Sequence, residues 1–376
     1  MSTSTGRCSI AHVKILVLLL MLSELGLVIG CRDKKQDSSE PIRIVSWGGR
    51  FQQDLFKDWW TPAAESCGVK IEPDSWDGVY GALTARIQKG INDWDLVHVE
   101  AHYVQNADAS SLFESFNRTI DSIDPGLVNQ TAVPVLQYGY ALAYRRDLLH
   151  RTNQPDWAEF FDVGRWPGRR SLRDFPVGNI EIALLAEHRD VNQVLYDPKL
   201  SRAQLESQVE DAFRRLETIR PSVIWWSSGD ELQRGLTSGD IVMSAAWSGR
   251  ILSAYRELCN TTAVEECKLQ VNGNTALVST DWWVIPKHAP HAERANKLLQ
   301  CMYTAPQAIK GALLFSQHQG YLVPLKSVSL SDPAADYFLR IGSSQNPHMR
   351  AHIDERFWSQ NYDWINNRWK QWRAAH

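Results

Sequence analysis

The chain has 376 residues, of which 44% are hydrophobic and 22% charged, the balance of a folded protein with room for two domains. The formal net charge of -3 excludes binding to nucleic acid through a strongly basic surface. Sixteen Trp residues stand out, because indole faces stack on sugars and cover organic cations.

The N-terminus has the features of a bacterial export signal. Basic residues precede the apolar run 15–22, which is shorter than the roughly 20 residues of a membrane-spanning helix. The segment VIGC resembles a lipobox and makes Cys31 the expected site of lipidation, with an ordinary signal peptide as the alternative. We therefore expect a signal peptide over residues 1–30 and a lipidated tether over 31–40, which anchor the protein in the cell envelope or periplasm.

With Cys8 lost in the signal and Cys31 taken by lipid, four cysteines remain in an oxidising compartment, where disulfides persist. Four cysteines allow three pairings. Cys259 and Cys267 bracket a short polar segment and form the preferred pair. Cys67 and Cys301 are expected to be two small buried residues.

Beyond Pro41, short apolar runs alternate with helical patterns, which indicates an α/β fold with largely parallel strands. In chain order the first part predicts a strand, a helix, a strand, a helix capped by Asp77 and a third strand. These elements cover residues 42–47, 51–66, 69–76, 78–90 and 94–100.

Two long apolar segments, 132–149 and 274–286, are predicted to cross between two lobes in opposite directions. Between them, the pattern predicts helices at 157–163, 179–188, 203–219 and 230–240, with strands at 169–174, 222–226 and 241–247. A long helix follows at 292–314. We expect lobe one to contain residues 41–137 and 281–325, and lobe two residues 138–280 and 326–376.

His98, Glu100 and His102 occupy alternate positions and so share one face of the third predicted strand. Such side chains are metal ligands, but neighbours on one face lie nearly 7 Å apart, too far for three ligands to share one ion. The preferred interpretation puts His98 in the core, bonded to backbone, with Glu100 and His102 beyond the strand's end. A metal-binding lipoprotein that uses Glu100 and His102 is an alternative.

Local signatures of common enzyme classes are absent from the sequence. It contains no G-x-S-x-G, H-E-x-x-H, Walker A, G-x-G-x-x-G or C-x-x-C motif. Glycosidase carboxylates carry no local motif, so a Trp-rich secreted glycosidase or a carbohydrate-binding protein is a further alternative.

Ligands of open parallel sheets bind beyond the carboxyl ends of the strands. Trp47, Glu100 and Trp247 follow predicted strands, and Asp281 lies near the return crossing. The residues therefore predict a cleft between the lobes, lined by indoles and carboxylates that suit a cationic ligand.

Six segments in order make the mature chain resemble the spermidine/putrescine-binding group of type II periplasmic binding proteins, which serve ABC importers. They are IVSWGG, YGALTARIQKGINDWDLVHVEAHYV, VPVLQYGYALAYRRDLL, IVMSAAWSGRI, TDWWVIPKHA and QGYLVP. The resemblance implies two lobes with mixed, mostly parallel sheets joined by crossing strands.

The resemblance also implies ligand-binding residues. Trp47 matches the Trp that covers the amine, and Asp281 in TDWWVIP matches the principal amine-binding aspartate. Trp247 and Tyr321 match two further aromatic positions, and Glu181 is the candidate for an acid in lobe two.

Departures from the family pattern affect the ligand. Glu100 and His102 replace a small hydroxyl residue and a Tyr, Phe51 lacks a hydroxyl, and Arg50 adds positive charge. Asp281, Glu100 and Glu181 together favour a di- or polyamine, whereas a charged His102 or an inward Arg50 favours a zwitterion or small anion.

The resulting prediction is an exported, monomeric solute-binding protein that carries a polyamine such as spermidine or putrescine to an ABC permease. It is not an enzyme and needs no cofactor or metal. Closure around hinges at 137–140 and 280–283 is expected to trap the solute.

Overall fold

The computed structural model describes residues 40–375, apart from 79–80, 106–107, 117–119, 125–126, 128, 150–152 and 260–262. The predicted export signal, the lipidation site Cys31 and residues 31–39 of the tether lie outside the described residues. Pro41–His376 forms one structural unit. Within the described ranges, no helix has both the length and the apolar character needed to cross a bilayer.

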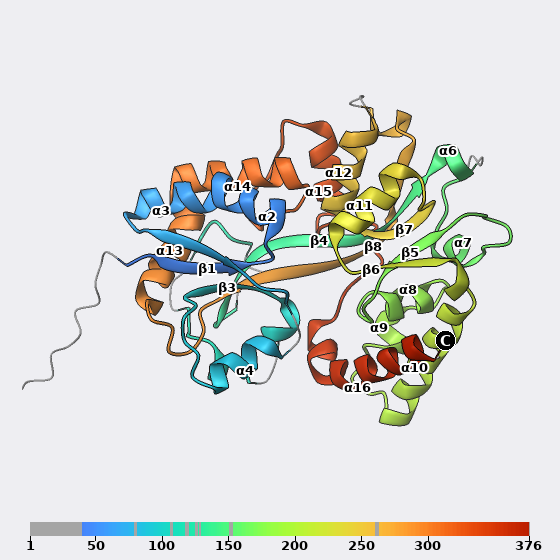
Figure 1. Ribbon diagram of the computed structural model, residues 1–376, viewed down its shortest axis with the longest axis horizontal. Helices are drawn as coiled ribbons and strands as arrows, with labels where there is room; N and C mark the ends of the chain where they lie inside the picture. Colours follow the sequence, from blue (N-terminus) through green and yellow to red (C-terminus); the bar gives the residue numbers. More distant parts are fainter. Residues whose placement is uncertain are drawn as a thin grey trace, which may run out of the picture. The chain divides into compact units, whose positions relative to one another are not determined.

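A nine-stranded mixed sheet runs through this unit, with helices on both of its faces (Figure 1). Its strand order is β2-β1-β3-β8-β4-β7-β5-β6, and β9 pairs with β8. The strands are β1 (Ile42–Ser46), β2 (Ile71–Ser75), β3 (Leu96–Glu100), β4 (Ala132–Arg145), β5 (Arg170–Arg173), β6 (Val223–Trp226), β7 (Met243–Trp247), β8 (Leu269–Val284) and β9 (Ala351–His352).

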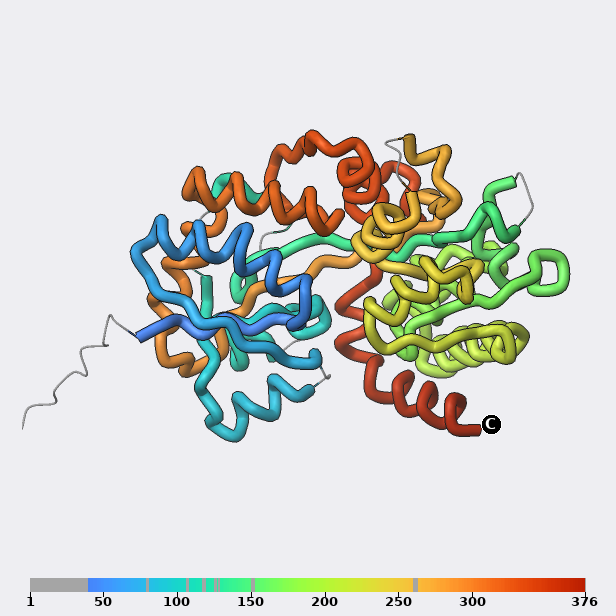
Figure 2. The backbone as a smooth tube through the Cα atoms, turned by 45° about the horizontal axis from the view of Figure 1, so that its top comes forward, coloured from blue at the N-terminus to red at the C-terminus, as the bar shows by residue number. Residues whose placement is uncertain are grey.

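The two predicted crossings are the long strands β4 and β8, which pair antiparallel along most of their length. Figure 2 shows these two strands running between the two halves of the fold. Their β-branched and aromatic residues favour extended chain, and nearly all of them are buried. Register shifts interrupt the pairing between Pro134 and Leu136 and between Tyr140 and Leu142. These irregularities flank the predicted hinge segment 137–140.

The sheet combines antiparallel pairing at its centre with parallel pairing towards both edges. β1 pairs parallel with β2 and β3, and β5 pairs parallel with β6 and β7. β8 is antiparallel to β3, and β4 is antiparallel to β7. Apart from the two-residue β9, which pairs parallel with β8, parallel pairing is confined to the outer strands, because the crossing strands run antiparallel through the middle of the sheet.

The hydrophobic core divides into parts on either side of the crossing strands. Clusters built mainly from residues 42–136 and 282–339 define lobe one, and a cluster built from 140–277 and 334–372 defines lobe two. Tyr138 and Trp247 pack against the cores of both lobes. The exact lobe boundaries given above stay a prediction.

The helices of lobe one include a continuous helical segment that the sequence predicts as one helix. It changes from α-helix to π-helix and back, and Gly68 ends it in the left-handed conformation that glycine adopts readily. The helices are α2 (Gly49–Asp54), η1 (Leu55–Trp60), α3 (Thr61–Cys67), α4 (Ala82–Gln88), η2 (Ala101–Tyr103), α5 (Ala109–Leu112), α13 (Ala292–Thr304) and α14 (Pro306–Gln319).

The C-terminal helix α16 (Glu355–Ala374) packs against α10 of lobe two, and its Tyr362 also stacks on His102 of η2 in lobe one. The other helices of lobe two are α6 (Arg146–Leu149), α7 (Trp157–Phe161), α8 (Asn179–Leu185), α9 (Val191–Val194), α10 (Arg202–Glu217), η4 (Arg220–Ser222), α11 (Gly229–Ser238), α12 (Ser248–Leu258), η5 (Val264–Glu266) and α15 (Pro333–Ile341).

Two disulfides join the four cysteines beyond the tether. Cys259 and Cys267 form the pair that the sequence favours. Cys67 and Cys301 form a second pair, which links α3 to α13, so the expectation that they are free buried thiols is wrong. This pair could not be predicted from the sequence, because the two cysteines lie 234 residues apart and meet only in the folded chain.

Candidate ligand-binding site

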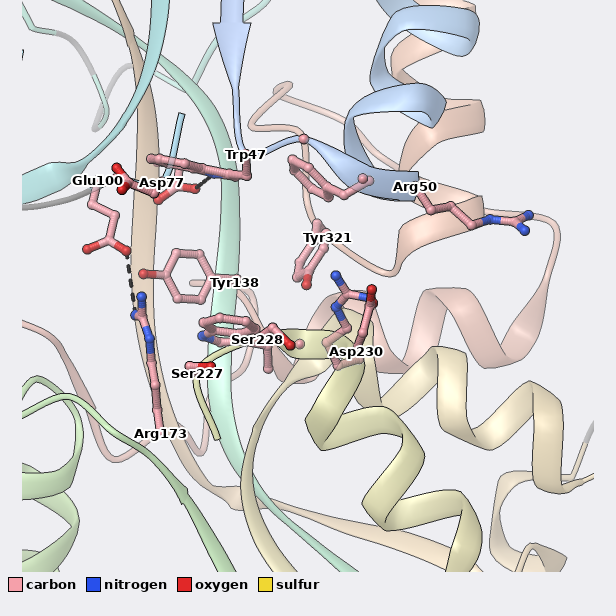
Figure 3. A pocket seen from close by; sticks show the side chains of 18 of the residues that line it. Trp47, Arg50, Asp77, Glu100, Tyr138, Arg173, Ser227, Ser228, Asp230 and Tyr321 are labelled. Atoms are coloured by element: carbon pink, nitrogen blue, oxygen red, sulfur yellow. Dashed lines mark hydrogen bonds and ion pairs between the residues drawn. The ribbon is translucent and has the colours of Figure 1, made fainter. Parts of the chain in front are cut away.

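A cavity of about 300 Å³ lies where the carboxyl ends of β1, β3, β5, β6 and β7 approach the crossing strands (Figure 3). Ligands of open α/β sheets bind at such strand ends. Its lining comes from both lobes: Trp47, Gly48, Gly49, Arg50, Phe51, Trp76, Asp77, Gly78, Glu100, Leu136, Tyr138, Arg173, Ser227, Ser228, Gly229, Asp230, Trp247, Arg250, Asp281 and Tyr321. Five predicted ligand residues, Trp47, Glu100, Trp247, Asp281 and Tyr321, are among them.

Asp281 on β8 is a buried carboxylate with one oxygen free of protein donors. Its Oδ2 lies 2.9 Å from His98 Nε2 and accepts a hydrogen bond of 3.3 Å from Trp47 Nε1. Its Oδ1 has no hydrogen-bond partner among the described residues. Burial raises the pKa of Asp281, and the hydrogen bond from His98 opposes this rise. A donor from a bound solute therefore has a buried acceptor to satisfy.

His98 lies in the core, as the sequence predicts, but its partners are side chains instead of backbone groups. Its ring is fully buried, with Nδ1 2.9 Å from Ser46 Oγ and Nε2 near Asp281. The parallel pairing of β3 with β1 brings Ser46 to His98, and the antiparallel pairing of β3 with β8 brings Asp281.

An aromatic wall covers this side of the cavity. The Trp47 indole stacks on Trp76 with ring centres 5.5 Å apart and planes inclined by 22°. Gly78 lies directly below it, since a Cβ there would come within 2.9 Å of the Trp47 ring. Stacked indole faces attract an organic cation.

Glu100 and Arg173 form an ion pair between the lobes, with Oε1 and Nη1 3.5 Å apart (Figure 3). The Arg173 guanidinium also lies 5.1 Å from the ring centre of Trp247 and donates a hydrogen bond of 3.4 Å to the Tyr140 hydroxyl. Burial lowers the pKa of Arg173, but the interactions with Tyr140 and Glu100 raise it by more. The net effect is a pKa above the usual value for arginine. Glu100 is thus already neutralised by a cation of the protein.

A second arginine lines the cavity near α11. Arg250 Nη1 lies 2.7 Å from Asp230 Oδ1, and the Asp230 side chain is 68% exposed. Exposed ion pairs contribute little free energy, so Arg250 is able to exchange this partner. Burial raises the pKa of Tyr321 to about 12 despite the opposing charge of Arg250, so its hydroxyl stays protonated.

Glu181 does not line the cavity, in contrast to the prediction that it binds ligand. It is fully buried in α8, where its carboxylate accepts hydrogen bonds from Tyr196, Trp358 and the backbone of Gly178. Because three donors inside the core of lobe two already bond to this carboxylate, Glu181 does not face the ligand cavity.

His102 does not line the cavity either. It lies in η2, where its ring is stacked 6.3 Å from Tyr362 of α16. Burial lowers the pKa of His102 to about 4, although Glu100 opposes this effect, so the ring is neutral at neutral pH. The sequence left open a positively charged His102 that would favour a zwitterion or an anion, and the structure does not support that charge. Glu100 Oε2 lies 3.7 Å from His102 Nδ1, and the described residues contain no cluster of three metal-ligating side chains.

The sequence analysis did not predict several of the residues that line the cavity. Arg173 is the last residue of β5, Arg250 lies in α12, and Tyr138 lies on β4. Burial and the neighbouring Asp281 raise the pKa of Tyr138 well above its usual value, so its hydroxyl remains a donor. Arg173 could have been predicted, because it lies at the carboxyl end of a predicted strand, where ligands of open sheets bind.

A second cavity of about 610 Å³ adjoins the first and shares the residues Arg50, Phe51, Asp230 and Arg250 with it. Its lining includes four cationic side chains, of Arg50, Lys57, Arg250 and Arg256, and two carboxylates. This space therefore disfavours a long polycation that extends from the first cavity.

Comparison with known proteins gives consistent results for most of the chain. Residues 61–348 match the family described as bacterial extracellular solute-binding protein. The gamma-aminobutyric acid (GABA)-binding protein of Pseudomonas aeruginosa is 28% identical over 354 residues, which cover 90% of this chain and 92% of that protein. A solved GABA receptor is 25% identical, with a TM-score of 0.75 over 90% of this chain and 98% of that one.

The spermidine/putrescine-binding protein PotD of Streptococcus pneumoniae has a similar fold. Its TM-score is 0.63 at 16% identity, over 89% of this chain and all of that one. This resemblance concerns the fold alone.

Proposed function

The chain belongs to the bacterial extracellular solute-binding proteins, and on that premise we propose that its ligand is a small zwitterionic ω-amino acid such as GABA. The protein is the solute-binding component of an ABC importer and is not an enzyme. Its family acts in the periplasm or cell envelope. Lipid attachment at Cys31 remains part of the proposal.

The fold agrees with this assignment. The predicted type II periplasmic binding protein fold is confirmed by solved neighbours that cover about nine-tenths of the chain. Such proteins bind a small solute between their lobes and deliver it to a permease.

One observation carries the choice of ligand: the cavity combines a buried acid that has an unused oxygen with two arginines. Burying an ammonium costs several kcal/mol, and a carboxylate about 4 Å away returns roughly 4 kcal/mol. Asp281 supplies this counter-charge, and the Trp47 face adds about 0.5 to 2 kcal/mol. Asp281 is thus the buried acid of the described lining that no arginine pairs with, and it can serve one ammonium.

The ligand's carboxylate is assigned to the opposite end of the cavity. Figure 3 shows Glu100 at one end and Tyr321 with Asp230 at the other, with Trp47 and Tyr138 between them. Asp281 bonds to Trp47, and Arg250 pairs with Asp230. We assign the ammonium to Asp281, and the carboxylate to Arg250 and the Tyr321 hydroxyl.

A polyamine is the second candidate, because Asp77, Glu100, Asp230 and Asp281 all line the cavity. However, Arg173 neutralises Glu100, Arg250 neutralises Asp230, and cations line the adjoining space. A diamine would therefore place its second ammonium close to an arginine.

Calorimetric titration tests the assignment with GABA, shorter and longer ω-amino acids, butylamine, butyrate and putrescine. We expect one ω-amino acid to bind most tightly, and butylamine and butyrate to bind at least tenfold more weakly, since each lacks one charge. Tighter binding of putrescine or spermidine than of every zwitterion would transfer the assignment to polyamines.

A further inference from the structure

Three polar side chains form a hydrogen-bonded chain beneath the ligand cavity. Ser46 lies at the end of β1, His98 on β3 and Asp281 on β8, three neighbouring strands of the sheet. The Ser46 Oγ to His98 Nδ1 and His98 Nε2 to Asp281 Oδ2 distances are both 2.9 Å. Only Asp281 lines the cavity.

This Ser-His-Asp arrangement is not built for nucleophilic catalysis. Ser46 is fully buried within the sheet, and the Trp47 and Phe51 rings lie 4.8 and 6.0 Å from the His98 ring. A substrate carbonyl has no access to the Ser46 hydroxyl. A catalytic serine must reach its substrate directly.

The chain is able to hold an extra proton without losing a hydrogen bond. When His98 is neutral, the Ser46 hydroxyl donates to Nδ1 while Nε2–H donates to Asp281. When His98 is protonated, both ring nitrogens donate and Ser46 accepts. The chain carries one negative charge in the first state and none in the second.

We propose that this chain is a proton-linked counter-charge, so that binding of the ligand's ammonium at Asp281 expels a proton from the Ser46–His98–Asp281 chain. This inference rests on the proposed function, because it needs a cationic group at Asp281. His98 and Ser46 act as positioning residues, because they touch Asp281 or each other and do not line the cavity. The ammonium is attracted only by the deprotonated chain, so binding and proton release are coupled.

The surroundings of Asp281 favour the state of the chain that carries no net charge before the ligand binds. Burial raises the pKa of Asp281, and Glu100 on β3 adds to the rise. Tyr138 on β4, Tyr321 after α14 and Glu355 on α16 also interact electrostatically with Asp281. Around His98 lie the uncharged rings of Trp47, Phe51 and Trp283. An incoming ammonium reverses this balance.

Calorimetric titration of the full protein with GABA in buffers of different ionisation enthalpy measures the protons released per ligand. Above about pH 5.5 the ligand's own carboxyl is already ionised. We expect release of up to one proton on the acid side, and an affinity that falls there by up to tenfold per pH unit.

Ser46→Ala distinguishes the proton-linked role from a merely structural one. It removes the acceptor of the charged Nδ1–H, and hydrogen bonds from charged donors are the stronger ones. The midpoint of the affinity profile should therefore move to lower pH by about 0.4 to 1 unit. Glu181→Gln is the matched control, because Glu181 is also buried but lies outside the cavity, and it should leave the profile unchanged.

The outcomes separate this inference from the proposed function. GABA binding without proton release, or with the same profile in wild type and Ser46→Ala, overturns the inference and leaves the function standing. Failure of every ω-amino acid to bind overturns both. His98→Gln provides a second variant that keeps side-chain hydrogen bonding, and it should also shift the profile.

Discussion

Asp281 and Arg250 bind opposite ends of the ligand in our assignment, so their substitutions should have different signatures. Asp281→Asn keeps the shape but removes the charge, and we expect GABA and butylamine each to bind at least tenfold more weakly, a loss of about 1.4 kcal/mol. Arg250→Met should weaken GABA by a similar factor and spare butylamine, which has no carboxylate. Calorimetry on both variants with both ligands measures this difference, and an equal loss of affinity for GABA and butylamine in Arg250→Met would contradict the assignment.

Glu181 provides a contrasting case of a buried acid with a structural role. In Glu181→Gln the new amide would face the Gly178 N–H, because Glu181 Oε2 now accepts that bond at 2.8 Å. An unsatisfied buried donor costs about 1–3 kcal/mol. We expect a lower free energy of unfolding by this amount and an unchanged affinity for ligand.

The pH dependence of this destabilisation has a definite sign. Burial raises the pKa of Glu181 in the folded state, although bonds from Tyr196 and Trp358 oppose the rise. The folded protein therefore holds the proton more tightly, and this stability is lost as pH rises through the raised pKa. Denaturant titrations between about pH 4 and 8 should show the deficit of Glu181→Gln shrinking with rising pH. A deficit that grows with pH would reverse this account.

At the scale of elements, the two disulfides differ in the length of chain that they close. Cys67–Cys301 joins α3 to α13 across 234 residues, whereas Cys259–Cys267 closes a loop of separation 8 after α12. Loop-closure entropy makes the long loop more stabilising by about 2 to 3 kcal/mol. Thermal and denaturant unfolding of the two double Cys→Ser variants should show the larger loss for Cys67 and Cys301. A larger loss for the short loop would show that local strain or residual structure outweighs chain entropy.

At the scale of the whole molecule, the two lobes touch through side chains near Glu100. The Glu100–Arg173 ion pair and the stacking of His102 on Tyr362 connect them, and β4 and β8 link them covalently. A ligand that contacts both lobes stabilises the closed form by its preference for that form over the open one. The register shifts around 137–140 weaken the ladder where bending is expected.

Closure predicts a measurable change in size. We expect the radius of gyration from small-angle X-ray scattering to fall when saturating GABA is added, and to stay constant with butyrate, which lacks the ammonium. Asp281→Asn is the control, since it keeps the shape of the side chain and should bind GABA weakly. An unchanged radius in wild type with bound GABA would mean that the lobes do not move.

Much of the architecture was predictable because local pattern and periodicity determine individual elements. The outer strands, most helices and the two crossings follow from apolar spacing, and the lining residues Trp47, Glu100 and Asp281 follow from strand ends and family resemblance. The pairing of Cys259 with Cys267 was also accessible, because the two are close in sequence. Export and lipidation at Cys31 remain predictions from the sequence.

Tertiary structure alone decided which charges meet. Arg173 lies 73 residues from Glu100 along the chain, and only the assembled sheet brings them together to neutralise one of the predicted amine-binding acids. The same assembly buries Glu181 among Tyr196 and Trp358, and His102 against Tyr362. Electrostatic interactions depend on distance and burial in three dimensions, so the sequence determined the class of protein, whereas the fold determined the charge of its cavity.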